Sequence, residues 1–478
     1  MPRSVATRAN PAPPRGLAMR ARELGLVPLV RLLRLGATLL AARVADALAA
    51  PFSSREARAA RRAGRPAREA HRVAAVLGEL KGPYAKLGQF AALRYDALPD
   101  GARDAFAALR DEVVPLRFGA VRPIVEAELG RPLELAFASF EPTALAAASI
   151  AQVHRARLPD GRAVAVKVQY PWLRASLPRD LRLARALLRL RALGRGRADA
   201  RERLFAEFAR GLAEELDFEH EARVAAEIAR NLADDPAIAV PAVVASHSTG
   251  RVLTMEWHPA LPIHDRAGLR RLGVDAAEVL EILARAYARQ IFVDGLFHAD
   301  PHPGNLFVLE ERGPRGPRVL FVDFGLSRRL EPALRRELRA AILAVLRGDL
   351  DGFVGGMRRM DMIAPGAEPG VRAAVERMFA RLRGEGAAPL ALGADRVLAL
   401  KDEAKALLAE TEGLQLPNDL LLYAKTLSYL FGLGAELAPQ VDLMRLTVPW
   451  LLRFLAAREE EPDPVSAPDA RAAAPAAG

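Results

Sequence analysis

Two short polar segments constrain this chain more than any other part of its sequence. The first, His298–Asn305, is rich in Pro and places Asp300 five residues before an Asn. The second, Asp323-Phe324-Gly325, follows the largely apolar run Arg318–Val322. An apolar run of this length predicts a short buried strand that ends at Asp323. Polar side chains from two separate segments are therefore expected to meet where that strand ends.

An Asp-x4-Asn segment followed by Asp-Phe-Gly is the pattern of a kinase active site. We expect Asp300 to lie beside the attacking hydroxyl or water, and Asn305 and Asp323 to hold the Mg²⁺ that bridges the nucleotide phosphates. Mg²⁺ prefers octahedral oxygen ligands and keeps several waters, so two protein groups from separate segments suit it. The alternative is that Asp300 forms a turn and Asn305 caps the next strand, which leaves the order of the upstream motifs unexplained.

Upstream, the segment Arg162–Val168 has the alternation of a strand and follows the turn Asp160-Gly161, which together predict a hairpin. It presents Lys167 where a nucleotide-binding lobe needs a cation on the phosphates. Only six of the 69 basic residues are Lys, so a retained Lys indicates that a compact ammonium is preferred to a planar guanidinium. A surface Lys on a strand is the alternative.

An acidic partner for Lys167 is expected from a following helix, Glu214–Ala222. Asp217 and Glu221 are four residues apart, so they would share one helix face, whereas Glu215 lies off it. The alternative is a solvated acidic helix face. The order of the motifs favours a carboxylate that pairs with Lys167.

The expected nucleotide loop is rich in Ala where an ordinary kinase has Gly-x-Gly-x-x-Gly. Ala carries a Cβ and approaches a phosphate less closely than Gly, so nucleotide handling should differ. Downstream, Val252–Trp257 predicts a strand whose end would hydrogen-bond adenine through the backbone, with Met255 and Trp257 either beside the base or in the core. The residues expected around the nucleotide are Ala146, Ala147, Ala148, Ser149, Ile150, Lys167, Met255 and Trp257.

These motifs resemble those of the UbiB (AarF/ADCK-like) family of atypical kinases over about residues 76–455. The segments that carry the resemblance are Lys86-Leu87-Gly88-Gln89, the Ala-rich loop, Glu215-Leu216-Asp217 and His298–Asn305. The resemblance implies an α+β, two-lobed protein-kinase-like fold, with a small lobe built on a mixed antiparallel sheet, a mainly helical large lobe and extra terminal helices. It also implies binding of ATP and Mg²⁺ and a role in ubiquinone or other isoprenoid-lipid biosynthesis at membranes, with a lipid or other quinone-biosynthesis proteins as partners.

The resemblance further implies that Lys86, Gly88 and Gln89 fold over the nucleotide site as a gate. Lys86 would then meet Glu215 and Asp217, which leaves Glu221 for Lys167. Such a cover obstructs the groove of a protein substrate, and no Ala-Pro-Glu follows Asp-Phe-Gly. An ATPase or small-molecule kinase is therefore favoured over a protein kinase. A nucleotide-gated lipid-binding scaffold with incidental hydrolysis stays open as the alternative.

The positive charge lies at the N-terminus, because residues 1–75 contain 15 Arg and 4 acidic residues in a chain of net charge +11. The apolar stretch Val27–Phe52 is interrupted by Arg31, Arg34 and Arg43, too often for a span of about 20 apolar residues. An amphipathic helix on an anionic membrane surface and a helix packed on the core fit equally well. No motif or aromatic interleaving supports nucleic-acid binding.

We expect a cytoplasmic protein or one held peripherally on the inner face of the cytoplasmic membrane, because the apolar run 443–457 is also too short to span. The absence of Cys excludes disulfides, thiolate catalysis and Cys-ligated metals. The expected segments are a flexible lead (1–20), a basic amphipathic helical region (21–75), a Lys-x-Gly-Gln helical extension (76–118), a small lobe (119–257), a large lobe (258–380), C-terminal helices (381–458) and a disordered tail (459–478).

Overall fold

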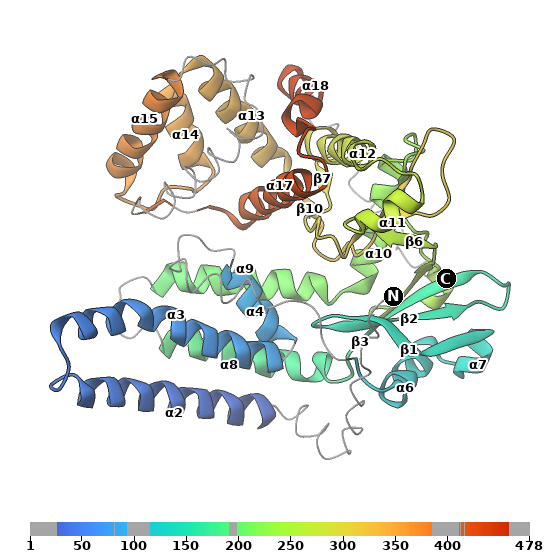
Figure 1. The fold of residues 1–478 in the computed structure, drawn as a ribbon, viewed down its shortest axis with the longest axis horizontal. Coiled ribbons are helices and arrows are strands. Elements are labelled where there is room, and N and C mark those ends of the chain that lie inside the picture. Colours follow the sequence, from blue (N-terminus) through green and yellow to red (C-terminus); the bar gives the residue numbers. More distant parts are fainter. Residues whose placement is uncertain are drawn as a thin grey trace, which may run out of the picture.

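The computed structural model describes residues 26–80, 82–92, 115–190, 198–384, 411, 413–414 and 416–457. The whole expected flexible lead and the whole expected tail lie outside these residues, as do parts of the expected basic region, Lys-x-Gly-Gln extension and C-terminal helices. Figure 1 shows a small sheet with helices beside it and a mainly helical layer above both.

The small lobe is built on an antiparallel sheet with the strand order β1-β2-β3-β5. Its strands are β1 (Ser139–Ala147), β2 (Ala151–Arg157), β3 (Ala163–Gln169) and β5 (Val252–Glu256). On one face, alternate residues Val164, Val166 and Val168 are fully buried against the helices α6 (Phe118–Leu129) and α7 (Leu133–Ala136). Since side chains alternate along a strand, β3 presents Lys167 on the opposite face.

Helix α10 links the two lobes, because its two ends pack into different cores. Phe218, at its start, packs against Leu253 of β5. Val224 and Ile228, further along, belong to the core of the large lobe. The described elements between β3 and β5 are α8 (Leu173–Leu190), α9 (Ala198–Glu215), α10 (Phe218–Asn231), β4 (Ile238–Ala239) and the 3₁₀ turn η1 (Ala245–His247).

Three N-terminal helices lie beside the small lobe: α2 (Leu26–Ala49), α3 (Arg55–Leu80) and α4 (Pro83–Ala92). Leu32 of α2 packs on the small side chains of Ala70 and Ala74 in α3. Arg43 of α2 donates to both carboxylate oxygens of Glu69 in α3, at 2.9 and 2.8 Å. Among the described residues, no helix is both long enough and apolar enough to cross a membrane.

The large lobe places its polar loop between short strands. A second sheet has the order β4-β9-β8-β6, and β7 pairs with β10. The elements of this lobe are β6 (Ala260–Pro262), α11 (Arg266–Arg271), α12 (Ala276–Arg289), the π-helix η2 (Gln290–Asp294), β7 (Leu296–Phe297), β8 (Leu306–Leu309), β9 (Val319–Phe321), β10 (Arg328–Arg329), α13 (Pro332–Arg347), α14 (Leu350–Arg359), α15 (Glu368–Gly384), α17 (Asn418–Leu437) and α18 (Leu443–Ala456).

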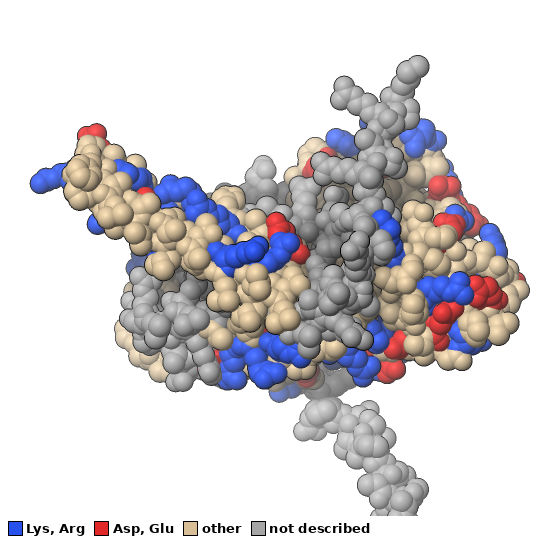
Figure 2. Space-filling view, turned by 90° about the horizontal axis from the view of Figure 1, so that it is seen from below, with Lys and Arg blue, Asp and Glu red and all other residues tan. Residues whose placement is uncertain are grey.

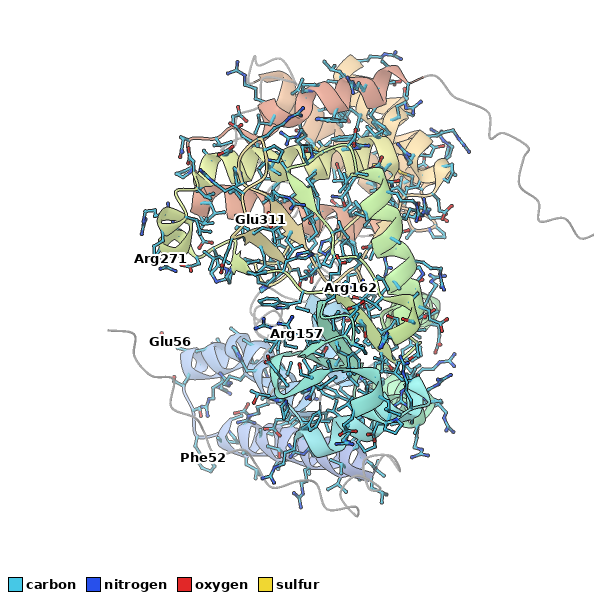
Figure 3. All side chains as sticks on the ribbon, turned by 90° about the vertical axis from the view of Figure 1, so that its right-hand side faces the viewer. Phe52, Glu56, Arg157, Arg162, Arg271 and Glu311 are labelled. Atoms are coloured by element: carbon cyan, nitrogen blue, oxygen red, sulfur yellow. The ribbon has the colours of Figure 1, made fainter. Side chains whose placement is uncertain are left out.

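The two lobes lie one above the other in the side view of Figure 3. Arg157 and Arg162, which flank the turn between β2 and β3, belong to the lower, small lobe, and Arg271 and Glu311 belong to the large lobe. Residues 298–305 connect β7 to β8, and Asp323 follows β9. The polar segments of the large lobe therefore lie on loops that a buried core holds in place.

Candidate active site

Lys167 and Glu221 form a buried ion pair between β3 and α10. Lys167 Nζ donates to both oxygens of the Glu221 carboxylate, at 2.8 and 2.9 Å. The side chains are 9% and 1% exposed, and the Phe218 ring centroid lies 5.1 Å from the same ammonium. A buried charge needs a partner to offset its lost hydration. The position of the Lys167 ammonium is therefore set by α10.

Asp323 approaches the same ammonium from the large lobe. Its Oδ1 accepts a hydrogen bond from Lys167 Nζ at 3.1 Å. The backbone of Asp323 has φ 62°, a left-handed conformation that costs an L-residue about 1–2 kcal/mol, although Asp tolerates it better than most. The Asp323 side chain is 43% exposed. One edge of the carboxylate is thus open to a ligand.

His298 holds this strained backbone in place. Its Nε2 donates to the carbonyl oxygen of Asp323 at 2.8 Å, and its Nδ1 accepts from the hydroxyl of Tyr287 at 3.1 Å. Burial lowers the pKa of His298, so the ring is neutral and has one donor and one acceptor nitrogen. The Phe324 ring packs edge-on against it at 5.4 Å. The first residue of the polar loop therefore supports Asp323.

Asp300 and Asn305 are hydrogen-bonded to each other within the loop. Asn305 Nδ2 donates to Oδ2 of Asp300 at 3.1 Å and to its carbonyl oxygen at 3.2 Å. Because the amide nitrogen faces Asp300, the amide oxygen of Asn305 points elsewhere. The N–H of Val322 donates to the carbonyl oxygen of Asn305 at 3.0 Å. The pairing of β8 with β9 thus brings Asn305 close to the segment that carries Asp323.

The second carboxylate oxygen of Asp300 has a partner that no motif predicts. Lys425 Nζ, on α17, donates to Asp300 Oδ1 at 2.8 Å. The motifs miss Lys425 because an apolar helix near the C-terminus has no phosphate-binding signature. The available signal was the scarcity of Lys, since Lys86, Lys167 and Lys425 are half of the six Lys in the chain.

Both acidic groups of the large lobe stay ionised, although the protein removes them from part of the solvent. Burial raises the pKa of Asp300, but the neighbouring positive charges, the Lys425 ammonium foremost, together outweigh burial and bring the pKa below its ordinary value. For Asp323, burial likewise raises the pKa, but the neighbouring positive charges, the Lys167 ammonium foremost, together outweigh burial and lower the pKa. Burial lowers the pKa of Lys167, but the carboxylates of Asp323 and Glu221 outweigh this effect and raise the pKa above its ordinary value. The site therefore keeps two carboxylates, each beside an ammonium, at neutral pH.

The Ala-rich segment Ala146–Ile150 forms the end of β1 and the tight turn that leads to β2. The N–H of Ala148 donates to the carbonyl oxygen of Ala151 at 2.8 Å. The Tyr170 hydroxyl donates to the carbonyl oxygen of Ala148, also at 2.8 Å. Ala146 and Ala147 are the last residues of β1. The turn is thus held by its own backbone and by one buried tyrosine.

The same turn is joined to the N-terminal helices. Gly82, just before α4, donates its N–H to the carbonyl oxygen of Ser149 at 3.0 Å. Ser149 is 2% exposed, and its hydroxyl has no hydrogen-bond partner among the residues that the structure describes. A buried polar atom without a partner is costly, so this hydroxyl marks a place where a ligand or water would be stabilised.

Two of the residues expected around the nucleotide have buried side chains. Ile150 and Met255 are buried in one cluster with Leu253. Trp257 follows β5, and the guanidinium of Arg155 lies 3.8 Å from its ring centroid. Adenine recognition by the backbone at the end of β5 stays a prediction.

The Lys-x-Gly-Gln segment lies on α4, close to the same site. Lys86 forms an ion pair with Glu215 at the end of α9, and both side chains are largely buried, 13% and 12% exposed. Its charge also contributes, after larger effects, to the lowered pKa of Asp300 and of Asp323. Gly88 is buried on the same helix, while the side chain of Gln89 lies outside the described part of the chain.

Asp217 lies between two helices, and its side chain caps the second one. The acidic segment is not one helix, because α9 ends at Glu215 and α10 begins at Phe218. Asp217 is extended between them (φ −99°, ψ 92°), and its carboxylate accepts the N–H groups of Glu219 and His220 as the N-cap of α10. The prediction that Asp217 and Glu221 share a helix face is therefore wrong.

The small antiparallel sheet, the buried Lys–Glu pair and the two polar segments define a protein-kinase-like fold. Residues 108–355 match the model of the ABC1 atypical kinase-like domain. The chain belongs to this family of atypical kinases. The predicted resemblance and the predicted two-lobed α+β fold are confirmed.

The chain is similar to curated proteins over most of its length. It is 32% identical over 376 residues to an uncharacterized protein of Synechocystis, covering 77% of this chain and 64% of the relative. It is 31% identical to the probable protein kinase UbiB of Marinobacter nauticus, covering 80% of this chain and 69% of that protein. Thus the chain spans slightly less than two thirds of the first relative.

A solved structure has the same arrangement. It is Rv3197 of Mycobacterium tuberculosis in complex with erythromycin, which is 26% identical and superimposes with a TM-score of 0.51. The match covers 80% of this chain and 95% of that chain.

Proposed function

We propose that this chain binds ATP with Mg²⁺ and acts as an atypical kinase-fold ATPase or small-molecule kinase. Lys167, fixed by Glu221, positions the phosphates, and Asp300 orients or deprotonates the nucleophile. The observation that carries the proposal is the convergence of the two lobes, since Lys167 of β3 lies 3.1 Å from Asp323. Phosphoryl transfer needs mainly positioning and charge stabilisation, and this arrangement offers both.

The residues present fit Mg²⁺. Asp323 offers a partly exposed carboxylate, and Asn305 offers an amide oxygen that is not engaged with Asp300. Mg²⁺ is commonly held by one or two protein oxygens, with phosphate oxygens and waters completing the octahedron. When bound, it neutralises charge on the phosphates.

Replacing Asp323 by Ala tests the proposal directly. We expect Mg²⁺-dependent ATP hydrolysis to fall by at least about 100-fold, because charge stabilisation of this kind contributes at least that much. Removing Mg²⁺ from the wild-type protein with EDTA should have the same effect. The measurement is phosphate release, and circular dichroism checks that the variant is folded. Hydrolysis at the wild-type rate in the variant would refute the assignment.

The proposal places this activity in ubiquinone or other isoprenoid-lipid metabolism at a membrane surface. The family and the relative named UbiB support the pathway. The exposed face of α2 supports the membrane, because large apolar side chains there face water and the same helix carries Arg31, Arg34 and Arg43. These apolar residues are Leu26, Leu29, Val30, Leu33, Leu40, Val44 and Leu48. Figure 2, seen from below the view of Figure 1, shows Lys and Arg side chains interspersed with uncharged residues on this side of the molecule. A deletion strain that keeps its normal quinone and isoprenoid-lipid content would contradict this part of the proposal.

A lipid-binding scaffold with incidental hydrolysis is the second candidate. The ion pair of Lys86 with Glu215 favours the scaffold, because this contact holds α4 near the acidic groups of the site. A helix held there would obstruct the groove of a protein substrate. Phosphate release with phosphatidylglycerol vesicles and with neutral phosphatidylcholine vesicles separates the two. Stimulation by the anionic vesicles alone indicates a lipid-coupled ATPase, whereas binding without a change in rate indicates the scaffold. Phosphate transfer to an added polypeptide would indicate a protein kinase, and we expect none.

A further inference from the structure

The polar loop of the site meets the helix α17 at Asp300. Lys425 Nζ lies 2.8 Å from Asp300 Oδ1, and the two side chains are 18% and 20% exposed. Helix α17 lies outside residues 108–355, which match the family domain. The site therefore receives a cation from a part of the chain beyond that domain.

Both the core and the loop fix the position of α17. The Tyr429 ring centroid lies 5.5 Å from Lys425 Nζ, and this ring meets the His302 ring edge-on at 6.2 Å. The leucines on the inner face of α17 are buried in the large-lobe core: Leu422, Leu430, Leu433 and Leu437. Groups held by rigid, packed elements are preorganised for a ligand. The packing of α17 thus fixes the position of Lys425, in contrast to a lysine on an open surface.

The Lys425 ammonium has hydrogen-bonding capacity that the protein does not use. An ammonium has three N–H donors. Among the described residues, Asp300 is the one acceptor with which Lys425 forms a hydrogen bond. Two donors are left for a ligand that lies beside Asp300.

The charge on Asp300 creates a need for this cation. A carboxylate and a phosphate oxygen repel each other at close range. The loop His298–Asn305 contains no Lys or Arg of its own, and Lys167 is engaged with Glu221 and Asp323. Lys425 is the ammonium in direct contact with Asp300, so it is placed to balance both negative groups.

We propose that Lys425 is a catalytic residue that binds the terminal phosphoryl group of the nucleotide and bridges it to Asp300. The inference rests on the proposed function and adds to it. Lys167 then serves the inner phosphates, and Lys425 serves the phosphate that is transferred. A nucleoside diphosphate lacks that group, so Lys425 should distinguish ATP from ADP.

The first test is equilibrium binding with Mg²⁺ present. We expect Lys425→Met to weaken binding of the β,γ-imido analogue of ATP by about tenfold, the loss typical of a hydrogen bond from a charged group. Binding of ADP should change by less than about twofold, because ADP does not reach Lys425. The inference is overturned if the binding of both nucleotides weakens equally, or if the binding of neither nucleotide weakens.

The second test uses the absence of Cys from the chain. Lys425→Cys introduces a single thiol, and its thiolate displaces bromide from 2-bromoethylamine to form a C–S bond. The product carries an ammonium at nearly the length of lysine. We expect the unmodified variant to lose about 100-fold in ATP hydrolysis and to regain most of it on aminoethylation. Alkylation with iodoacetamide, which leaves a neutral amide, should restore nothing.

Matched controls separate the possible failures. Glu436→Cys, at an exposed position of the same helix, should hydrolyse ATP at the wild-type rate before and after aminoethylation. If Lys425→Cys keeps its rate while Asp323→Ala loses it, the inference fails and the proposed function stands. If Asp323→Ala keeps its rate, the proposed function itself fails. A loss at Lys425→Cys that aminoethylation does not repair also overturns the inference, because the ammonium is then not what the site needs.

Discussion

Replacing Asp323 by Gly and by Ala separates the strain in its backbone from the chemistry of its carboxylate. Asp323 has φ 62°, and Asp361, on the turn after α14, has φ 54°. A Cβ in this region costs about 1–2 kcal/mol, whereas Gly avoids that cost but adds about 0.4–1 kcal/mol of entropy to the unfolded chain. At either position, the Gly variant should therefore have a free energy of unfolding about 0.5–1 kcal/mol higher than the Ala variant.

Loss of the Asp323 carboxylate itself should affect stability little. The side chain is 43% exposed, and an ion pair so open to solvent contributes at most about 1 kcal/mol. Lys167 also keeps Glu221 as its partner, at 2.8 and 2.9 Å. The expected effect of Asp323→Gly is thus a folded protein, near wild-type stability, without turnover.

Urea unfolding of the four variants, together with ATP hydrolysis, measures both effects. The variants at Asp361 provide the matched control, because they should show the same preference for Gly while keeping wild-type hydrolysis. Equal stabilities of the Gly and Ala variants at Asp323 would refute the argument from backbone strain. A large loss of stability in Asp323→Gly would show that the carboxylate has a structural role that its exposure does not suggest.

Two further predictions concern buried ionisable groups. Glu221→Leu leaves the buried Lys167 ammonium without its main partner, so the free energy of unfolding should fall by about 3–5 kcal/mol. The double variant Lys167→Met with Glu221→Leu should recover most of the lost stability in urea unfolding, and a double variant as unstable as the single one would contradict the prediction. Burial lowers the pKa of His154, whose ring nitrogens are engaged by the carbonyl oxygen of Glu141 at 2.8 Å and by Gln152 at 2.9 Å. Below the pKa of about 6.5 that His has in the unfolded chain, the unfolded state binds more protons than the folded state, so the free energy of unfolding should decrease as the pH decreases, by at most about 1.4 kcal/mol per pH unit for this group. Unfolding at several pH values should show a flatter dependence in His154→Gln than in the wild-type protein, and an identical slope would sink the prediction.

The strand that carries Lys167 could be predicted because its signal is local. Alternating side chains fit a pleated surface with one buried face, and the turn before it places Gly161 at φ 90°, where Gly is favoured. The strand before Asp323 was predictable for a similar reason, since a short apolar run between polar loops suits a buried strand. Both elements carry their structural information within a few consecutive residues.

Contacts between distant segments could not be predicted in this way. Lys425 meets Asp300 because α17 packs into the large-lobe core, and no periodicity in either segment encodes that packing. The break before α10 was missed because an acidic run has good helix propensity. Burial of Phe218 against the sheet starts a new helix there, and Asp217 caps it. The preference of Asp for N-caps was the local signal that could have indicated the break.

The separation of Asp300 and Lys425 along the chain has a consequence for protein synthesis. The ribosome adds Lys425 125 residues after Asp300, so a nascent chain can form the strands around the polar loop long before α17 emerges. If Lys425 acts as proposed, such an intermediate lacks the cation that the last phosphate requires. Stalled or prematurely terminated products that stop before α17 would then still bind a nucleoside diphosphate but turn over ATP poorly, and full turnover would begin only after α17 has been added.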